Sequence, residues 1–239
     1  MTTIRTNLQR VRERMAAACA GAQRQVNEVA LLAVSKTFGP DAVREAFAAG
    51  QVAFGENYIQ EAVEKIALLA DLPLEWHCIG PIQSNKTRLV ATHFHWAHTI
   101  DRLKVAQRLS EQRPESLSAL QVCIQVNVDS GATKAGVAPG EVLELAREVA
   151  RLPRLKLRGL MTIPEPAAGF AAQKAVHLKA KALFEELQGE LREAGLALDT
   201  LSMGMTADLE AAIAAGSTMV RVGTAIFGTR HGADSVAPK

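Results

Sequence analysis

Residues 198–224 read LDTLSMGMTADLEAAIAAGSTMVRVGT, and this stretch decides the fold class. Two short strand-like runs, 198–202 and 218–222, are each followed at once by a loop with glycine and threonine, MGMT after the first and GT after the second. A helical segment, 207–214, separates the two runs, which predicts a right-handed βαβ unit with parallel strands. In α/β barrels, the loops after the seventh and eighth strands commonly bind phosphate.

Upstream of this stretch, short apolar and β-branched runs alternate with helical patterns. Six further strands are predicted, at 29–34, 52–54, 75–79, 95–100, 120–128 and 155–163. With the last two they make eight, the number that closes a barrel. A doubly wound open sheet shows the same alternation, but no G-x-G-x-x-G follows the first strand and no Walker-type lysine loop occurs. The predicted fold is a single (β/α)8 barrel of TIM type.

An extra helix is predicted before the first strand, within residues 1–26, because its apolar residues repeat at a spacing near 3.6. That stripe is Ile4, Leu8, Val11, Met15 and Cys19. Three later helices have apolar faces formed by Ile59, Ala62, Val63 and Ile66, by Val142, Leu145, Ala146 and Val149, and by Val176, Leu183, Phe184, Leu187 and Leu191. Gly195 is expected to end the third. The whole chain is expected to be one domain, with a poorly ordered tail at 231–239.

The composition is that of a soluble globular protein, with 48% hydrophobic and 22% charged residues among 239. A net charge of +2 and the lack of a basic block argue against nucleic-acid binding. No apolar run is long enough to span a bilayer and no signal-peptide core is present, so we expect a cytoplasmic protein without a membrane partner. Cys19, Cys78 and Cys123 lie far apart in apolar contexts and are expected to be core thiols.

Lys36 follows the first predicted strand directly, at the end of a barrel where catalytic groups gather. One reading is an ordinary solvated lysine at a strand end. The other is a partly desolvated amine at the barrel mouth that condenses with an aldehyde. Because strand one lies beside strand eight in a closed barrel, this amine would neighbour the predicted phosphate loops. The combination suits a phosphorylated aldehyde cofactor.

Several motifs along the chain resemble those of one protein family. They are AVSK (33–36), FGENY (54–58), WHCIGPIQSNK (76–86), SMGM (202–205) and VRVGTAIFG (220–228). In this order they resemble the pyridoxal phosphate homeostasis proteins. The resemblance implies a barrel like the N-terminal domain of alanine racemase without its second domain, and pyridoxal 5′-phosphate as the cofactor. One departure is Cys78, where members more often carry phenylalanine, and it puts the local packing in doubt.

The resemblance also implies the residues that bind the cofactor, which are Lys36, Asn57, Ser202, Gly204, Arg221, Gly223 and Thr224. Lys36 would carry the cofactor as a Schiff base, and the phosphate would lie at Ser202, Gly223 and Thr224. Arg221 would face the pyridine nitrogen, although from the strand pattern alone it could be a surface arginine or an ion-pair partner in the barrel. A permanently charged donor at that nitrogen disfavours its protonation and weakens the ring as an electron sink.

Two polar groups lie outside these motif roles. Four histidines lack the spacing and the further ligand of a metal site, so no metal is predicted at His77, His93, His95 or His98. A small basic group after the third strand is most simply the solvated start of a helix, or else a contact for a second anion or for an acceptor of the cofactor. It comprises Asn85, Lys86 and Arg88.

Two function classes compete on these grounds. A racemase needs an acid/base on each face of the cofactor, and a barrel lysine supplies only one. In alanine racemase, a tyrosine from the second domain of a partner subunit opposes the lysine, whereas the only tyrosine here is Tyr58, within the barrel. We therefore expect a carrier that holds pyridoxal phosphate and delivers it to apo-enzymes with little turnover. An amino-acid racemase or aldolase is the alternative. Absence of the dimer-forming second domain favours a monomer.

Overall fold

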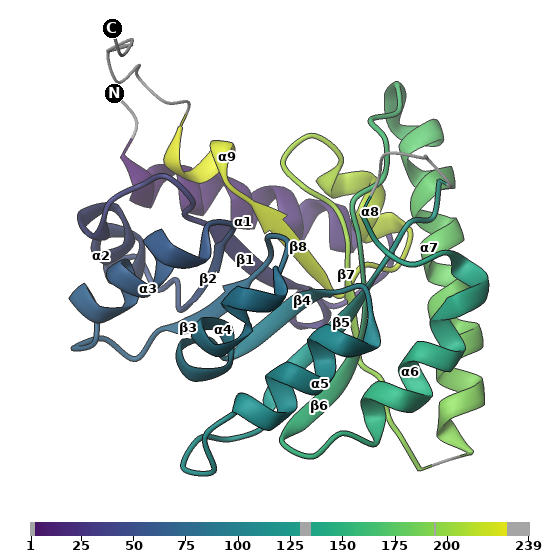
Figure 1. The fold of residues 1–239 in the computed structure, drawn as a ribbon. Coiled ribbons are helices and arrows are strands. Elements are labelled where there is room, and N and C mark those ends of the chain that lie inside the picture. The colour runs from purple at the N-terminus through teal and green to yellow at the C-terminus, as the bar shows by residue number, and fades with distance from the viewer. Residues whose placement is uncertain (1–2, 130–134, 194, 229–239) are drawn as a thin grey trace, which may run out of the picture.

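The computed structural model describes residues 3–129, 135–193 and 195–228. Within them, parallel strands β1 to β8 form a closed barrel in sequence order, and helices pack around the outside (Figure 1). The barrel closes between its first and last strands, where Leu32 pairs with Arg221 and Ala33 with Val222. The predicted TIM-type barrel is confirmed, and a doubly wound open sheet is excluded. The predicted flexible tail at 231–239 lies outside the described residues.

The strands are β1 (Ala30–Val34), β2 (Ala53–Glu56), β3 (Glu75–Cys78), β4 (Trp96–Ile100), β5 (Leu120–Val126), β6 (Leu155–Thr162), β7 (Thr200–Ser202) and β8 (Met219–Val222). The helices are α1 (Ile4–Gly21), α2 (Pro40–Ala48), α3 (Ile59–Leu68), α4 (Thr87–His93), α5 (Leu103–Gln112), α6 (Val142–Ala150), α7 (Gly169–Arg192), α8 (Leu209–Ala214) and α9 (Thr224–Phe227). Short 3₁₀ segments cover Val26–Glu28, Ser84–Lys86 and Pro139–Glu141. Each predicted strand is present with bounds within two residues of the prediction.

Helix α1 is the predicted extra helix before the barrel. The Thr3 side chain caps its first turn by accepting the backbone N–H of Thr6 at 3.2 Å. Of the predicted apolar stripe, Ile4 is half-buried and the other four residues are buried. Helix α1 packs along α8 and α9 (Figure 1). Arg14 of α1 pairs with Glu210 of α8 at 2.8 Å. The first helix therefore covers elements from the far end of the chain, next to the closing strand pair.

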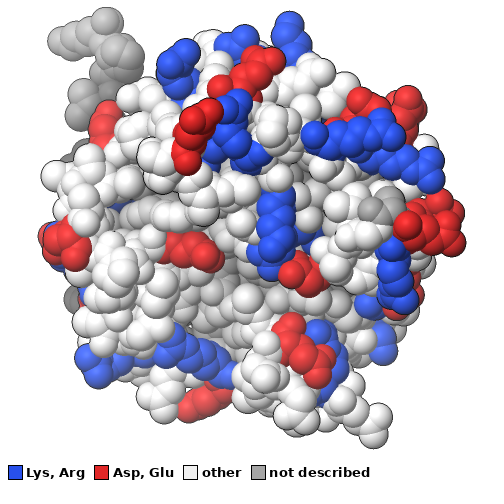
Figure 2. All heavy atoms as spheres, turned by 90° about the horizontal axis from the view of Figure 1, so that it is seen from below, with Lys and Arg blue, Asp and Glu red and all other residues white. Residues whose placement is uncertain are grey.

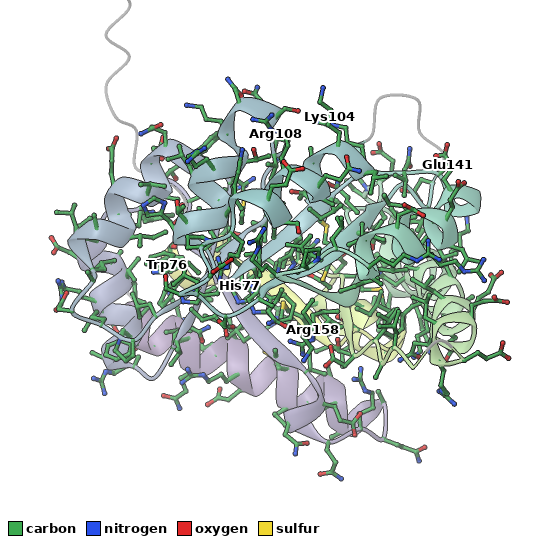
Figure 3. The ribbon with its side chains drawn as sticks, turned by 60° about the horizontal axis from the view of Figure 1, so that its bottom comes forward. Trp76, His77, Lys104, Arg108, Glu141 and Arg158 are labelled. Atoms are coloured by element: carbon green, nitrogen blue, oxygen red, sulfur yellow. The ribbon has the colours of Figure 1, made fainter. Side chains whose placement is uncertain are left out.

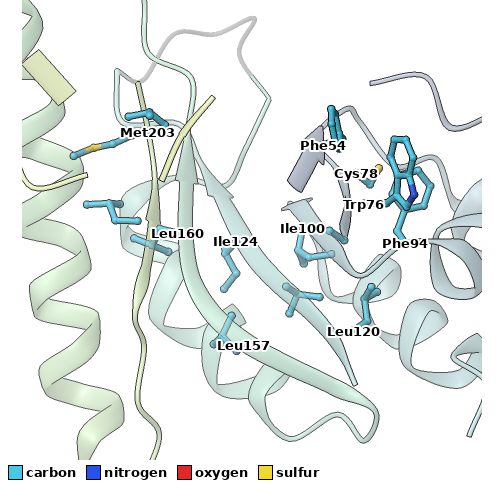
Figure 4. Packing of buried hydrophobic residues seen from close by; sticks show 14 of the residues in the cluster. Phe54, Trp76, Cys78, Phe94, Ile100, Leu120, Ile124, Leu157, Leu160 and Met203 are labelled. Carbon is cyan, nitrogen blue, oxygen red and sulfur yellow. The ribbon is translucent and has the colours of Figure 1, made fainter. Parts of the chain in front are cut away.

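The main hydrophobic core lies between the outer faces of the strands and the surrounding helices. Figure 4 shows Cys78 beside Phe54 and Trp76 in this core, with Phe94 close by. Burial raises the pKa of the Cys78 thiol to about 12, so it packs as a small neutral side chain. The expectation that Cys19, Cys78 and Cys123 are buried free thiols is confirmed.

The interior of the barrel is filled by separate, smaller groups of side chains. One apolar cluster comprises Leu32, Val34, Ile79 and Met219, and another comprises Trp96, Cys123 and Met161. Successive residues of a strand point to opposite faces. Lys36, two residues beyond Val34, therefore continues the inward-facing row of β1 to the barrel mouth, and Arg221 continues the row of Met219.

The surface carries charges of both signs. Figure 2 shows one face on which lysine and arginine side chains are interspersed with aspartate and glutamate. Among the described residues, no helix is long and apolar enough to cross a bilayer.

Candidate functional site

A cavity of about 280 Å³ opens at the carboxyl ends of the strands. It is lined by Val34, Lys36, Asn57, Ile79, Ile163, Met205, Thr206, Ala207, Arg221, Gly223 and Thr224. These residues come from the ends of β1, β2, β3, β6 and β8 and from the loop after β7. In α/β barrels this is the end that carries the active site. Five of the seven predicted cofactor-binding residues line the cavity, namely Lys36, Asn57, Arg221, Gly223 and Thr224.

Lys36 stands at the cavity wall next to the loop after β8. Its side chain is exposed rather than partly desolvated, and no bond or ion pair joins it to any other described residue. The pairing of Ala33 with Val222 brings the end of β1 against Gly223. A Cβ at that position would lie 3.2 Å from the carbonyl oxygen of Val34, so glycine permits the close approach. A free amine thus faces the cavity beside a glycine-containing loop.

The loops after β7 and β8 bring two hydroxyl groups together in the cavity. Thr224 Oγ1 lies 3.4 Å from Thr206 Oγ1, and both residues line the cavity with Gly223. Hydroxyl groups on adjacent barrel loops are suitable donors to a phosphate. The sequence predicted both loops, and the family resemblance implied Ser202, Gly223 and Thr224 at the phosphate but did not include Thr206.

Arg221 is the buried cation of the site. Its side chain lines the cavity, yet the residue is only 4% exposed. Nη1 donates to Ser202 Oγ at 2.9 Å, and Nη2 donates to the carbonyl oxygen of Thr162 at 2.8 Å. Burial lowers the pKa of Arg221 to about 10, which leaves the guanidinium charged at neutral pH. The cavity therefore has a fixed positive donor in its floor.

Ser202 and Gly204 lie beneath the cavity rather than in its lining. Ser202 is fully buried, and its hydroxyl contacts Arg221 and His98 Nδ1, the latter at 3.2 Å. Gly204 has a φ of +92°, and a Cβ there would lie 2.3 Å from the Cβ of Ala212 in α8. This geometry gives the Ser202 hydroxyl a contact with Arg221, and the predicted contact of Ser202 with the phosphate stays a prediction. The same geometry makes Gly204 the residue that lets α8 pack against the loop.

The side-chain oxygen of Asn57, Oδ1, lacks a hydrogen-bond partner in the described part of the chain. This atom is buried, although the residue lines the cavity. A buried acceptor without a partner is costly, and a bound ligand is one way to supply a donor. Gly80 permits this arrangement, because a Cβ there would lie 2.1 Å from the carbonyl oxygen of Asn57.

A buried ion pair behind the site fixes the end of β1. Lys65 Nζ donates to Glu56 Oε1 at 2.6 Å and to the carbonyl oxygen of Ser35 at 2.9 Å. Ser35 Oγ donates to the same Glu56 oxygen at 2.6 Å. Burial raises the pKa of Glu56, although Lys65 opposes the shift. These bonds hold the residue before Lys36 against β2 and α3.

Sequence reasoning did not find this ion pair. The predicted apolar face of α3 included Val63 and Ile66, but these residues are only half-buried. Lys65, which the prediction left out, is buried. The available signal was the spacing of Ile59, Ala62 and Lys65, which places the lysine on the buried side of the helix.

The remaining candidate residues lie away from the cavity lining. Tyr58 is 53% exposed and lines a neighbouring cavity of about 310 Å³ that shares Lys36. Lys86 Nζ bonds Gln60 Oε1 at 3.4 Å, while Asn85 and Arg88 are exposed near the start of α4. The described residues contain no group of three or more potential metal ligands.

A family model described as "Alanine racemase, N-terminal domain" matches residues 2–231. The fold and the site thus define a barrel of the alanine racemase N-terminal domain class. The pyridoxal phosphate homeostasis protein of Pseudomonas aeruginosa is 57% identical over 230 residues, covering 96% of this chain and 97% of that protein. Its counterpart in Escherichia coli strain K12 is 52% identical over 233 residues, covering 96% and 98%. The chain belongs to the pyridoxal phosphate homeostasis protein family.

Solved structures agree with this assignment. PipY of Synechococcus elongatus without pyridoxal phosphate is 39% identical with a TM-score of 0.79, covering 91% of this chain and 99% of PipY. PipY with pyridoxal phosphate bound is 38% identical with a TM-score of 0.77, covering 90% and 100%. An alanine racemase from Clostridium difficile is 16% identical with a TM-score of 0.68, covering 96% of this chain and 57% of that enzyme. The last comparison shows a shared fold alone.

Proposed function

We propose that this protein binds pyridoxal 5′-phosphate in the cavity at the barrel mouth and serves in the intracellular homeostasis and delivery of that cofactor. The observation that carries the proposal is that the Lys36 amine, the Arg221 guanidinium and the paired hydroxyls of Thr206 and Thr224 line one cavity. The names of the curated relatives and the pyridoxal phosphate bound in the PipY structure support it.

The residues present fit this cofactor. Thr206, Thr224 and the backbone at Gly223 would hold the phosphate, and Arg221 would donate to the ring nitrogen. Bound pyridoxal phosphate supplies an aldehyde, with which a primary amine condenses to a Schiff base as water leaves. Lys36 has the amine for this step, and the unpartnered Oδ1 of Asn57 would accept a hydrogen bond from the ligand.

The same lining favours a carrier over a racemase. Among the described residues that line the cavity, Lys36 and Arg221 are the titratable ones. Two-base racemisation needs a second proton acceptor on the opposite face, and Arg221 is a poor base because its guanidinium stays charged. A charged donor at the ring nitrogen also weakens the ring as an electron sink. Transfer to apo-enzymes and a monomeric state are parts of this proposal.

Borohydride reduction followed by peptide mass spectrometry tests the proposal. Purified protein loaded with pyridoxal phosphate should show a visible absorption band, and reduction should attach the cofactor to Lys36. The Lys36→Ala variant should lose the band and the label, whereas Lys86→Ala should keep both. Labelling of Lys86 instead, or no label at all, would overturn the assignment of Lys36. Delivery is tested separately, by mixing loaded protein with an apo-enzyme and following recovery of that enzyme's activity.

A further inference from the structure

A continuous chain of hydrogen bonds runs along the inside of the barrel to Arg221. Glu75 Oε1 lies 2.8 Å from His77 Nε2, and His77 Nδ1 lies 2.9 Å from His98 Nε2. His98 Nδ1 lies 3.2 Å from Ser202 Oγ, which accepts a bond from Arg221 Nη1 at 2.9 Å. This hydrogen-bond chain starts at Glu75, the first residue of β3, and ends at Arg221 of β8, which lines the cavity. It therefore connects the two ends of the barrel.

The middle of this chain is sealed from solvent. His77, His98 and Ser202 are fully buried, whereas the Glu75 side chain is about half exposed at the amino end of β3. The Trp96 ring stacks on His77 with centroids 5.1 Å apart and an interplanar angle of 9°. Figure 3 shows His77 among the strands of the barrel, while Lys104, Arg108 and Glu141 lie out on the surface. Packing therefore holds the rings in place.

The protonation states of these groups give every hydrogen bond along this path the same direction, from Arg221 to Glu75. Burial lowers the pKa of His77 and lowers that of His98 well below the usual value, so both rings are neutral. Hydrogen bonding to His77 lowers the pKa of Glu75, which keeps it a carboxylate and an acceptor only.

His77 must then donate from Nε2 and accept at Nδ1, because a neutral imidazole has one N–H. By the same rule His98 donates from Nε2 to His77 and accepts at Nδ1 from the Ser202 hydroxyl. Ser202 in turn accepts from Arg221. Each group is thus a donor on one side and an acceptor on the other, from the guanidinium to the carboxylate.

We propose that Glu75, His77 and His98 are positioning residues for Arg221, which they hold at the cavity floor through this one-way hydrogen-bond chain. Arg221 forms no direct ion pair with a carboxylate in the described part of the protein. Asp208 acts on its charge through space, whereas Glu75 is connected to it through hydrogen bonds. The proposal rests on the proposed function, because it assigns these residues to the contact between Arg221 and the ring nitrogen of the cofactor. The hydrogen-bond chain thus connects a solvent-exposed carboxylate at the amino ends of the strands to the binding site at their carboxyl ends.

The hydrogen-bond chain itself is tested without any ligand, by ¹⁵N–¹H NMR of the imidazole nitrogens in the unmutated protein. Both His77 and His98 should carry a proton on Nε2 and none on Nδ1. The Glu75→Leu variant should lose the fixed tautomer of His77, whereas Glu64→Leu, which removes an exposed glutamate from α3, should leave both rings unchanged. A doubly protonated ring, or a proton at Nδ1 of either ring, would overturn the proposal even if a variant fails to fold.

The positioning of Arg221 is tested by calorimetry with pyridoxine 5′-phosphate, which has the ring and the phosphate but no aldehyde. His98→Leu, which breaks the hydrogen-bond chain, should weaken its binding by about 10-fold, the loss expected when the charged Arg221 no longer makes a well-placed hydrogen bond. The same variant should leave the affinity for inorganic phosphate unchanged. Equal affinities for pyridoxine 5′-phosphate in His98→Leu and unmutated protein would overturn the positioning role. If the unmutated protein binds neither this compound nor pyridoxal phosphate, the proposed function fails, whatever the tautomers are.

Discussion

Thr206 Oγ1 lies 3.4 Å from Thr224 Oγ1, so the loops that follow β7 and β8 meet through their hydroxyl groups. Asp208 fixes the first of these loops, because its Oδ1 accepts the backbone N–H of Met205 at 2.6 Å, and its other oxygen contacts His177 Nε2 at 2.9 Å. The hydroxyl of Thr206 is thereby held in a loop that is braced from the side of α7. This relationship braces the end of the cavity where we propose that phosphate binds, while the Lys36 amine has no bond to another described residue.

Replacing these hydroxyls should weaken phosphate binding selectively. We expect Thr206→Val and Thr224→Val each to weaken binding of pyridoxine 5′-phosphate by roughly 10-fold, since each removes a bond to a charged acceptor. Calorimetry measures this directly. Binding of pyridoxal, which has no phosphate, serves as the control and should change little. A similar loss of affinity for both compounds would mean that the threonines support the fold of the cavity and do not contact phosphate.

Breaking the buried ion pair behind Lys36 should destabilise the protein. Lys65→Met leaves the Glu56 carboxylate buried without its cation, and removal of one partner of such a pair costs about 3 to 5 kcal/mol. Urea unfolding followed by circular dichroism measures the loss. The double variant Lys65→Met/Glu56→Leu should recover much of the free energy of unfolding, because no unpaired charge remains. A double variant that loses the sum of both single effects would contradict the role assigned to the pair.

Acid should lower stability through the two buried histidines. Burial lowers the pKa of His77 and His98 in the folded state, so the unfolded chain binds more protons below its own histidine pKa of about 6.5. Stability is then fully present above this pH and falls as the pH drops, by about 1.4 kcal/mol per pH unit for each ring. Urea unfolding between pH 7 and pH 5 tests this. The double variant His77→Gln/His98→Gln should flatten the slope, and an unchanged slope would refute the assignment.

The sequence predicted the barrel well because its strands are short apolar runs with clear turn residues between them. It also predicted Lys36 at the barrel mouth, since the end of a strand decides where this residue lies. The strand pattern alone left the place of Arg221 open, and only the family resemblance put it at the cofactor. The contact of Ser202 with Arg221 was missed, although Leu201 lies in the outer core while Ser202 faces inward, an alternation visible in the sequence. The partner of an inward-facing side chain depends on the stagger between strands, which the sequence pattern does not reveal.

Turnover of amino acids should be very low. We expect the protein loaded with pyridoxal phosphate to exchange the Cα hydrogen of L- or D-alanine far more slowly than enzymes act, whose rates are about 1 to 1000 per second. The cavity lining offers Lys36 as one base and no second one among the described residues, and a missing general base costs roughly 10² to 10⁴-fold. Arg221 adds to this by leaving the ring a weak electron sink. Deuterium incorporation in heavy water, followed by NMR, measures the exchange.

Tyr58→Phe should not alter the rate, because Tyr58 lies outside this lining and is exposed. Fast exchange that disappears in both Tyr58→Phe and Lys36→Ala would instead identify a racemase that works within one barrel.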